Sequence, residues 1–356
     1  MWIVSKFPYI WSLKATTFTK DKGKVFSCFA CGGGSSMGYK LAGFDVIGVN
    51  EIDPKMMDAY KTNHNPKYAF LEPIQTFKLR DDLPQELFNL DILDGSPPCS
   101  SFSMAGDREE KWGVEKKFRE GQQEQVLDTL FFDFIDLAKK LQPKIVVAEN
   151  VKGLLLGNAK TYVLKIYEEF EKAGYYVKHW LLDSSCMGVP QRRERVFFLA
   201  IRKDLAAPFL EQLDMFLVTP RINLDFNETP ITFGEFKDEM GRELSPNMKV
   251  IWEGREHGDS SMEAACMRIQ GKQKYFSQSY LYVNKTPSTL TSHEDALVLF
   301  DSPRYTSKNE ACKIGSFPLD YNFLNNKPHY IIGMSVPPIM VAQIATRIYD
   351  TWLKNM

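Results

Sequence analysis

The six residues Gly95-Ser96-Pro97-Pro98-Cys99-Ser100 follow directly on a short apolar run, and they constrain the fold more than any other part of the chain. The run before them, Leu90-Asp91-Ile92-Leu93-Asp94, is typical of a buried strand in a parallel sheet. Two consecutive prolines fix the backbone, so the thiol of Cys99 is presented at the carboxyl edge of that sheet. Open α/β sheets bind their ligands at this edge. The sequence therefore predicts a reactive cysteine, with a half-buried structural thiol in an ordinary turn as the alternative.

Two more polar clusters lie beside apolar runs that have the composition of buried strands. Glu149 and Asn150 follow the run 144–148, and the cluster 191–195 leads into the run 196–201. If these runs are strands of one sheet, the clusters share an edge with Cys99. The alternatives are a helix-capping role for Glu149 and a solvated surface for the arginines of the second cluster.

A glycine-rich stretch near the N-terminus is typical of a nucleotide-binding turn. The pattern predicts a strand at 24–29, a helix at 35–42 and a strand at 44–49, which together form a βαβ unit. Glycines follow the first strand, and Glu51 after the second can accept hydrogen bonds from ribose hydroxyls. A nicotinamide-dependent oxidoreductase is the alternative, but the spacing departs from G-x-G-x-x-G and such an enzyme gives no role to the Pro-Pro-Cys turn.

The rest of the chain predicts one large α/β domain and one smaller domain. Apolar spacing indicates helices at 54–63, 122–141, 159–173 and 340–353. Periodicity fails from about 203 to 286, so we place a smaller, irregular domain there. The predicted boundaries are an N-terminal extension at 1–23, the large domain at 24–202, the smaller domain at 203–285 and a return to the large domain at 286–356.

Composition excludes several classes of protein, among them membrane-spanning and disulfide-rich proteins. With 356 residues, of which 44% are hydrophobic, the chain can bury the cores of two domains. It has no run of about eighteen apolar residues and no apolar signal segment at 1–23, so we expect a cytoplasmic protein without a membrane partner. The six cysteines lack a framework spacing, and Cys28 and Cys31 have no second pair to complete a metal site. A net charge of -1 requires any nucleic-acid surface to be local.

Several motifs follow one another in a fixed order: Phe29-Ala30-Cys31-Gly32-Gly33-Gly34, Asn50-Glu51-Ile52-Asp53, the Pro-Pro-Cys turn, Glu149-Asn150-Val151, the cluster 191–195, residues 304–318 and Gly333-Met334-Ser335-Val336-Pro337-Pro338. With this order the chain resembles the cytosine-5 DNA methyltransferases of prokaryotic or phage type, over most of residues 24–353. The resemblance implies an α/β fold with a Rossmann-like methyltransferase sheet at 24–202 and 286–356. It also makes 203–285 the target-recognition domain.

The resemblance implies a cofactor, S-adenosylmethionine, which leaves as S-adenosylhomocysteine, and no metal. Glu51 would bind the ribose, Ile52 would lie against the adenine, and Phe29 would lie near the methionine end. The residues implied to bind the cofactor are Phe29, Gly32, Gly33, Gly34, Glu51, Ile52, Glu72, Pro98 and Ser335. The family has asparagine where this chain has Met334, so Ser335 or the backbone would serve instead.

The implied reaction is methyl transfer to carbon 5 of a cytosine flipped out of duplex DNA. The thiolate of Cys99 would add to carbon 6, because carbon 5 is otherwise a poor nucleophile. Glu149 would hold ring nitrogen 3, Arg193 would orient Glu149, and Arg195 would reach the carbonyl oxygen of the base. The loop 100–118 would close over the flipped base. The residues implied to contact DNA are Ser101, Ser103, Gln191, Arg268, Lys272 and Lys274.

The implied partner is double-stranded DNA, bound by a monomer, with a cognate restriction endonuclease that acts independently. A tRNA cytosine-5 methyltransferase on the same fold is the main alternative, and the length of the region 203–285 favours DNA. A non-catalytic DNA-binding relative would have lost Cys99, Glu149 or the arginines, and this chain keeps them. Basic and aromatic residues interleave between 268 and 285, as in a surface that contacts phosphates and reads base edges.

Overall fold

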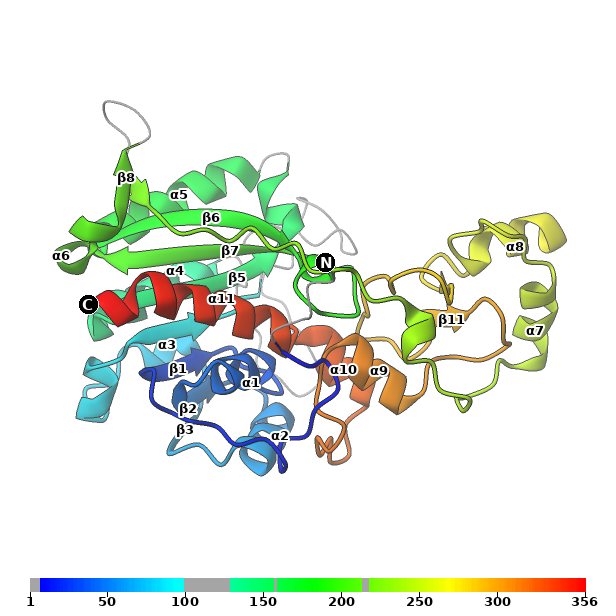
Figure 1. The fold of residues 1–356 in the computed structure, drawn as a ribbon, viewed down its shortest axis with the longest axis horizontal. Coiled ribbons are helices and arrows are strands. Elements are labelled where there is room, and N and C mark those ends of the chain that lie inside the picture. Colours follow the sequence, from blue (N-terminus) through cyan, green and yellow to red (C-terminus); the bar gives the residue numbers. More distant parts are fainter. Residues whose placement is uncertain (1–6, 99–128, 157–158, 213–217) are drawn as a thin grey trace. The chain divides into compact units, whose positions relative to one another are not determined.

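The computed structural model describes residues 7–98, 129–156, 159–212 and 218–356 (Figure 1). The chain folds into two compact units. The larger, here called the sheet unit, comprises Phe18–Asp183, Glu194–Asp225 and Val341–Met356. The smaller, here called the second unit, comprises Met1–Thr17, Ser184–Arg193 and Phe226–Met340.

The sheet unit is built on seven strands in the order β3-β2-β1-β4-β5-β7-β6. From β3 to β5 in this order all neighbours are parallel, whereas β7 runs antiparallel to both β5 and β6. The strands are β1 (Lys24–Cys28), β2 (Asp45–Glu51), β3 (Tyr68–Leu71), β4 (Ile92–Gly95), β5 (Ile145–Val151), β6 (Tyr175–Asp183) and β7 (Glu194–Arg202). A short pair, β8 (Leu210–Gln212) and β9 (Val218–Pro220), belongs to the same unit. The α/β fold class is confirmed.

Helices connect the strands of the sheet unit, and the longer ones lie close to the places that the sequence predicts. They are α1 (Gly34–Leu41), α2 (Pro54–His64), α3 (Ile74–Phe77), α4 (Leu130–Leu141), α5 (Ala159–Lys172), α6 (Lys203–Ala206) and most of α11 (Pro338–Thr351). α2 begins at Pro54 because the Asp53 carboxylate accepts from the first backbone N–H groups and proline suits the first turn. Residues 122–128 of the helix predicted at 122–141 lie outside the described residues.

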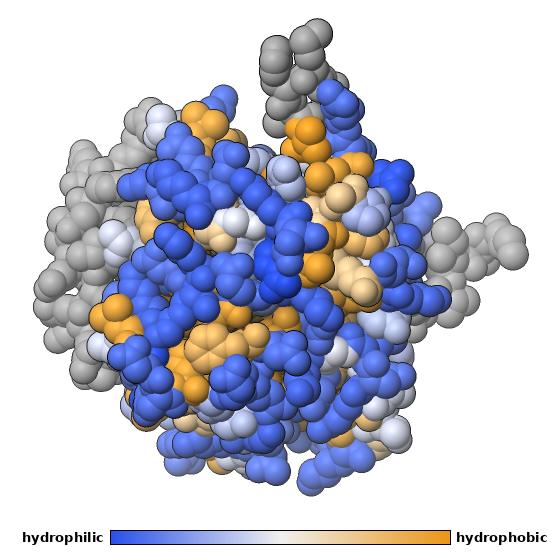
Figure 2. Space-filling model, turned by 90° about the vertical axis from the view of Figure 1, so that its left-hand side faces the viewer, coloured by the Kyte–Doolittle hydropathy of each residue, from blue (hydrophilic) through white to orange (hydrophobic). Residues whose placement is uncertain are grey.

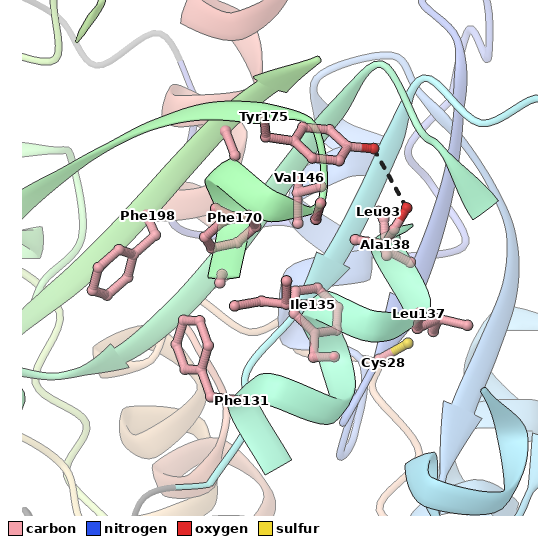
Figure 3. Close-up of a cluster of buried hydrophobic side chains, with 14 of the residues drawn as sticks. Cys28, Leu93, Phe131, Ile135, Leu137, Ala138, Val146, Phe170, Tyr175 and Phe198 are labelled. Atoms are coloured by element: carbon pink, nitrogen blue, oxygen red, sulfur yellow. Dashed lines mark hydrogen bonds between the residues drawn. The ribbon is translucent and has the colours of Figure 1, made fainter. Parts of the chain in front are cut away.

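The core of the sheet unit lies between the sheet and helices α4 and α5 (Figure 3). Side chains from three strands and both helices meet there: Leu93, Val146, Phe198, Phe131, Ile135 and Phe170. The hydroxyl of Tyr175 donates to the carbonyl of Pro143 at 2.8 Å, so this buried ring keeps a polar partner. Side chains alternate along a strand, so Leu93 faces this core and its neighbour Asp94 faces the opposite side of the sheet.

The second unit has its own apolar core. Its helices are α7 (Pro246–Glu253), α8 (Met262–Gln270), α9 (Lys308–Ile314) and α10 (Pro328–Met334), and its strands β10 (Ser279–Leu281) and β11 (Leu297–Leu299) form a parallel pair. Ile251, Cys266, Tyr280, Val298 and Tyr305 meet in the core. The predicted irregular stretch thus includes α7 and α8, whose short apolar faces give little periodic signal.

The two units divide the chain differently from the predicted boundaries. Residues 203–225 lie in the sheet unit, where β8 pairs with β9. Residues 286–340 lie in the second unit, because β11 pairs with β10 and joins the same core. The start of the chain also docks on the second unit, where the indole of Trp11 donates to the carbonyl of Ser316 at 2.9 Å.

One stretch, Pro328–Asn355, is long and apolar enough to cross a membrane by length and composition alone. Its most apolar window is 89% buried inside the protein, which is typical of a core helix. The face drawn in Figure 2 is mostly hydrophilic, with apolar side chains in small groups. Small apolar groups of this kind are ordinary on protein surfaces.

Candidate active site

The glycine-rich stretch forms a tight turn between β1 and α1. Gly33 has a φ of +84°, in the left-handed region that favours glycine. A Cβ at this position would collide with the imidazole of His64 and approach the ring of Tyr60. Phe29 and Cys31 also have positive φ values, 53° and 47°. The turn therefore admits no side chain at Gly33, as a backbone that closely approaches a ligand requires.

The carboxylate of Glu51 is tied into the same turn. It accepts from the backbone N–H groups of Cys31 (2.8 Å), Ile52 (2.8 Å) and Asp53 (3.0 Å). Burial raises the pKa of Glu51, and these three hydrogen bonds partly oppose that rise. A carboxylate has about four acceptor positions, so about one remains for a ligand hydroxyl. The glycine turn and this buried carboxylate fit a nucleoside cofactor.

Glu72, also implied to bind the cofactor, has a carboxylate that is already occupied. Arg80 donates to one oxygen at 2.9 Å, and the hydroxyl of Thr76 donates to the other at 3.2 Å. The side-chain amide of Asn50 donates to the backbone carbonyl of Glu72 at 2.8 Å. Glu72 therefore lies beside β2, and its carboxylate forms an ion pair with Arg80.

The turn that leads to Cys99 is held from the neighbouring strand. The side-chain amide of Asn150, on β5, donates to the carbonyl of Pro97 at 3.1 Å. Its oxygen accepts from the N–H of Val151 at 2.8 Å, which fixes the amide. Pro98 is the last described residue of the turn, and Cys99, Ser101, Ser103 and the predicted loop 100–118 lie outside the described residues. The sequence analysis placed Asn150 near the site but gave it no role. In the structure it positions the Pro-Pro turn.

Arg195, and not Arg193, pairs with Glu149. The Nε atom of Arg195 lies 3.0 Å from an Oε1 of Glu149, and both side chains are largely buried. β7 is antiparallel to β5, so its first residues lie beside the carboxyl end of β5, with Arg195 opposite Val151. Burial lowers the pKa of Arg195, and the charge of Glu149 acts in the opposite direction. The antiparallel strand explains how a cluster that precedes its strand reaches the catalytic edge.

Arg193 and Gln191 form hydrogen bonds with backbone groups within the second unit. Arg193 donates to the carbonyls of Leu290 at 3.2 Å and Gly333 at 2.9 Å. Gln191 donates to the carbonyl of Ile314 at 3.2 Å and accepts from the N–H of Leu290 at 3.0 Å. Gln191 is 1% exposed, and its contact with DNA stays a prediction. In the structure the ion pair with Glu149 is formed by Arg195, and the role of Arg193 toward Glu149 stays a prediction.

Ser335, another implied cofactor residue, lies at the end of α10 in the second unit. Its hydroxyl donates to the carbonyl of Ile331 at 2.7 Å and is buried. The nearby Gly333 has no room for a Cβ, which would collide with the backbone of Thr291. This close approach gives the glycine of the last motif a packing role.

The residues implied to contact DNA divide into paired and exposed groups. Arg268 forms ion pairs with Asp259 and Glu256 and donates to the carbonyl of Gly254 at 3.0 Å. Lys272 and Lys274 are exposed. The tyrosines of the predicted aromatic and basic surface, Tyr280 and Tyr282, are buried in the core of the second unit. Only part of that surface is therefore open to a ligand.

One buried carboxylate beside the site was missed. Asp94, on β4, is 3% exposed and accepts from the hydroxyls of Ser27 (2.8 Å) and Tyr39 (3.1 Å). Burial raises the pKa of Asp94 to about 7, the two hydrogen bonds lower it, and the charge of Glu149 raises it. The sequence feature that could have revealed Asp94 is an acidic residue at the end of a run that is otherwise typical of a buried strand. Among the described residues, no cluster of three His, Cys, Asp or Glu side chains could hold a metal ion.

The chain is similar in sequence and in structure to known methyltransferases. The chain is 38% identical over 182 residues to the type II methyltransferase M.FnuDI of Fusobacterium nucleatum, a match that covers 51% of this chain and 48% of the relative. It is 27% identical over 332 residues to M1.HphI of Haemophilus parahaemolyticus, covering 90% and 85% of the two chains. Among solved structures, DNMT2 of Spodoptera frugiperda superposes with a TM-score of 0.60 at 19% identity, over 90% of this chain and 98% of that one, which shows the shared fold.

The first of these matches spans about half the length of the relative. The family model of the C-5 cytosine-specific DNA methylases, in contrast, matches residues 23–350, across both units. A glycine turn with a buried glutamate, a held Pro-Pro turn and a Glu149–Arg195 pair lie within that range. The chain belongs to the C-5 cytosine-specific DNA methylase family.

Proposed function

We propose that this protein transfers a methyl group from S-adenosylmethionine to carbon 5 of cytosine in double-stranded DNA. The observation that carries the proposal is the 3.0 Å ion pair between Arg195 and Glu149. It lies at the end of β5, where Asn150 also holds the turn that leads into Cys99. Addition to a pyrimidine ring needs a nucleophile, a carboxyl group and a cation.

In the proposed reaction Cys99 activates the base. Its thiolate forms a bond to carbon 6, and the electron pair displaced from the ring double bond makes carbon 5 nucleophilic. After carbon 5 has gained the methyl group, its proton leaves to a base and the sulfur–carbon bond breaks. The thiolate of Cys99 is thereby restored, and 5-methylcytosine is released.

Glu149 and Arg195 stabilise the charge that this addition creates. The Glu149 carboxyl holds the proton at ring nitrogen 3 while electron density enters the ring. Arg195 fixes the orientation of Glu149, and its remaining N–H groups can donate to the carbonyl oxygen of the base. The pair is largely buried, so its field acts with little screening by water.

The glycine turn and Glu51 would hold the cofactor, which supplies an electrophilic methyl group on a sulfonium. Gly33 lets the backbone approach it, and the free acceptor position of Glu51 would take one ribose hydroxyl. Phe29 and Ile52 are half-buried beside the turn and offer apolar contacts. We assign no cofactor contact to Glu72, because Arg80 holds its carboxylate.

The proposed substrate is duplex DNA in the cytoplasm, recognised by a monomer through the second unit. A restriction endonuclease with the same target would be a separate protein. The type II names of the relatives support this setting. A tRNA substrate is the alternative, and it predicts methyl incorporation into tRNA and none into duplex DNA.

Two measurements test the proposal. Bisulfite sequencing of DNA from a host that expresses the full chain should reveal protected cytosines in one sequence context. A duplex with 5-fluorocytosine at that position should then become covalently attached in the presence of cofactor, because fluorine cannot leave as a proton. Cys99→Ser should give neither protection nor adduct, since a hydroxyl is a far weaker nucleophile at neutral pH. Protection without any adduct would contradict the mechanism, and no protection would contradict the function.

A further inference from the structure

The second unit carries a long stretch of sequence without acidic residues. Residues 264–293 contain Arg268, Lys272, Lys274 and Lys285 but no aspartate or glutamate, in a chain with 45 acidic residues. A local positive potential therefore coexists with a net charge of -1. Such a surface favours a polyanionic partner.

The loop 271–278 projects from this stretch with both ends fixed. Gly271 caps the C-terminal end of α8, with a φ of +63° and an N–H that donates to the carbonyl of Met267 at 3.0 Å. At the other end, the N–H of Met262 donates to the carbonyl of Gln278 at 2.9 Å. The N–H of Gln278 in turn donates to the carbonyl of Tyr275 at 3.1 Å. The loop is thus a short, anchored projection.

Two adjacent aromatic residues of the loop have opposite environments. Tyr275 has a φ of 65° and packs against the core of the second unit. Phe276 is 81% exposed. Left-handed backbone is uncommon for a residue other than glycine, and here it accompanies a turn that buries one ring and exposes the next. A phenylalanine held out on an anchored loop is available to a partner.

The charges on the loop are also available. Lys272 and Lys274 are exposed, and neither forms an ion pair within the described part of the chain. Arg268, one turn earlier on α8, differs because Asp259 and Glu256 neutralise it. Two cations that lack an ion pair among the described residues therefore precede the exposed ring, four and two residues before Phe276.

We infer that Phe276 inserts between stacked base pairs of duplex DNA while Lys272 and Lys274 bind the neighbouring phosphates. The inference rests on the proposed function, which supplies the duplex. Apolar side chains that enter base steps unstack and kink the helix, and phosphate contacts from lysine hold the protein in register. The exposed lysines and the lack of acidic residues within 264–293 favour a nucleic acid over an apolar protein surface.

The test uses the full-length protein and a duplex that contains its methylated sequence. Affinity is measured at several salt concentrations, and the bend of the duplex is measured by energy transfer between dyes at its ends. Phe276→Ala should weaken binding about tenfold, as the loss of one stacking contact does, and should reduce the bend at an unchanged salt slope. The double variant K272Q/K274Q should lower the salt slope by about two while keeping the bend. Met240→Ala, which removes another apolar side chain of the same unit that is 80% exposed, should match the wild type.

A fluorescent variant gives an independent measurement. Phe276→Trp should show strongly quenched emission when the target duplex binds, because the indole stacks on bases. Unchanged bend and affinity in Phe276→Ala, or unchanged emission in Phe276→Trp, would overturn the inference. If the wild type methylates the duplex in the same assay, such a result leaves the proposed function intact. A wild type that methylates no duplex would instead refute the proposed function.

Discussion

Ser27 and Asp94 lie opposite each other on the adjacent strands β1 and β4, joined by a 2.8 Å hydrogen bond from the serine hydroxyl to the carboxylate. β1 leads into the glycine turn, and β4 leads into the Pro-Pro-Cys turn. The hydroxyl of Tyr39 adds a bond from α1. One buried carboxylate thus links the elements proposed to hold the cofactor and the nucleophile.

Asp94 should make the stability of the protein depend on pH. Its folded pKa of about 7 exceeds the unfolded value of about 4, so the folded state binds more protons between these values. Wild-type stability should therefore fall by up to a few kcal/mol as the pH rises from about 4 to about 7, and change little through this group above it. Asp94→Asn keeps a hydrogen-bonding partner for Ser27 and has no carboxyl to titrate.

Urea unfolding at pH 5 and pH 8 measures this effect. The wild type should lose more stability between the two pH values than Asp94→Asn does. Asp58→Asn, which alters an exposed carboxylate on α2, should behave as the wild type. Equal losses in all three proteins would show that Asp94 does not titrate in this range.

Arg195 and Arg193 should fail in different ways when each is changed to lysine. Arg195→Lys loses the directional contact with Glu149, so methylation in a single turnover should fall about 100-fold or more at a nearly unchanged melting temperature. Arg193→Lys cannot bond both Leu290 and Gly333 in the same geometry, so its melting temperature should fall first. The reverse pattern would return Arg193 to the catalytic role that the sequence predicted.

The sequence correctly predicted the strands and helices that have a clear apolar pattern or a clear start signal. The central strands β1, β4 and β5 each contain a short apolar run, as strands buried on both faces do, and the Asp53-Pro54 pair marks the start of α2. The edge strand β6 was missed because Lys178 and His179 interrupt its apolar residues. Sequence spacing gave the cluster 191–195 as one group, but the structure divides it between the two units.

The hydrogen-bond partners of individual side chains could not be predicted either, because they depend on strand register and tertiary packing. Arg193 and Arg195 are two residues apart, and only the antiparallel register of β7 against β5 gives Arg195 to Glu149. The contacts of Gln191 and Ser335 depend on the carbonyls of residues 314 and 331 in the last turns of α9 and α10, which sequence spacing does not pair with these side chains. The residue types suggested the chemistry of the site, whereas the register of β7 against β5 determines which arginine pairs with Glu149.

Glu51→Gln should weaken the binding of S-adenosylmethionine. An amide offers one acceptor atom where the carboxylate has two, and its NH2 group would face backbone donors. Loss of a charge-assisted hydrogen bond to a ribose hydroxyl should cost about 1.5–3 kcal/mol, or at least a tenfold loss in affinity by calorimetry. Glu168→Gln, on the exposed side of α5, is the control. Equal affinities would mean that Glu51 only shapes the turn.

Two glycine-to-alanine variants should separate backbone strain from collision. Gly33 and Gly174 both have positive φ values, but only Gly33 has neighbours where a Cβ would lie. Gly174→Ala should cost about 1 kcal/mol from its backbone alone, whereas Gly33→Ala should cost more and also reduce cofactor affinity. Denaturant unfolding and calorimetry measure both effects. A Gly33→Ala protein as stable as Gly174→Ala would show that His64 and Tyr60 yield without cost.

Exchange of the recognition segment with that of a relative should succeed only if it respects the second unit. A chimaera that replaces 203–285 separates β10 from β11 and divides the core that Tyr280 shares with Val298 and Tyr305. It should therefore unfold at a lower temperature than the parent. Replacement of 226–340 keeps that core together, so this chimaera should fold, methylate and mark the relative's sequence in bisulfite sequencing.

The outcome depends on where specificity lies. The second unit contains the exposed loop with Lys272, Lys274 and Phe276, whereas Glu149, Arg195 and the glycine turn belong to the sheet unit. Recognition should consequently move with the exchanged segment, and the chemistry should stay with the sheet unit. If the 226–340 chimaera folds and methylates but still marks the parent's sequence, base recognition belongs to the segment that contains Ser101 and Ser103.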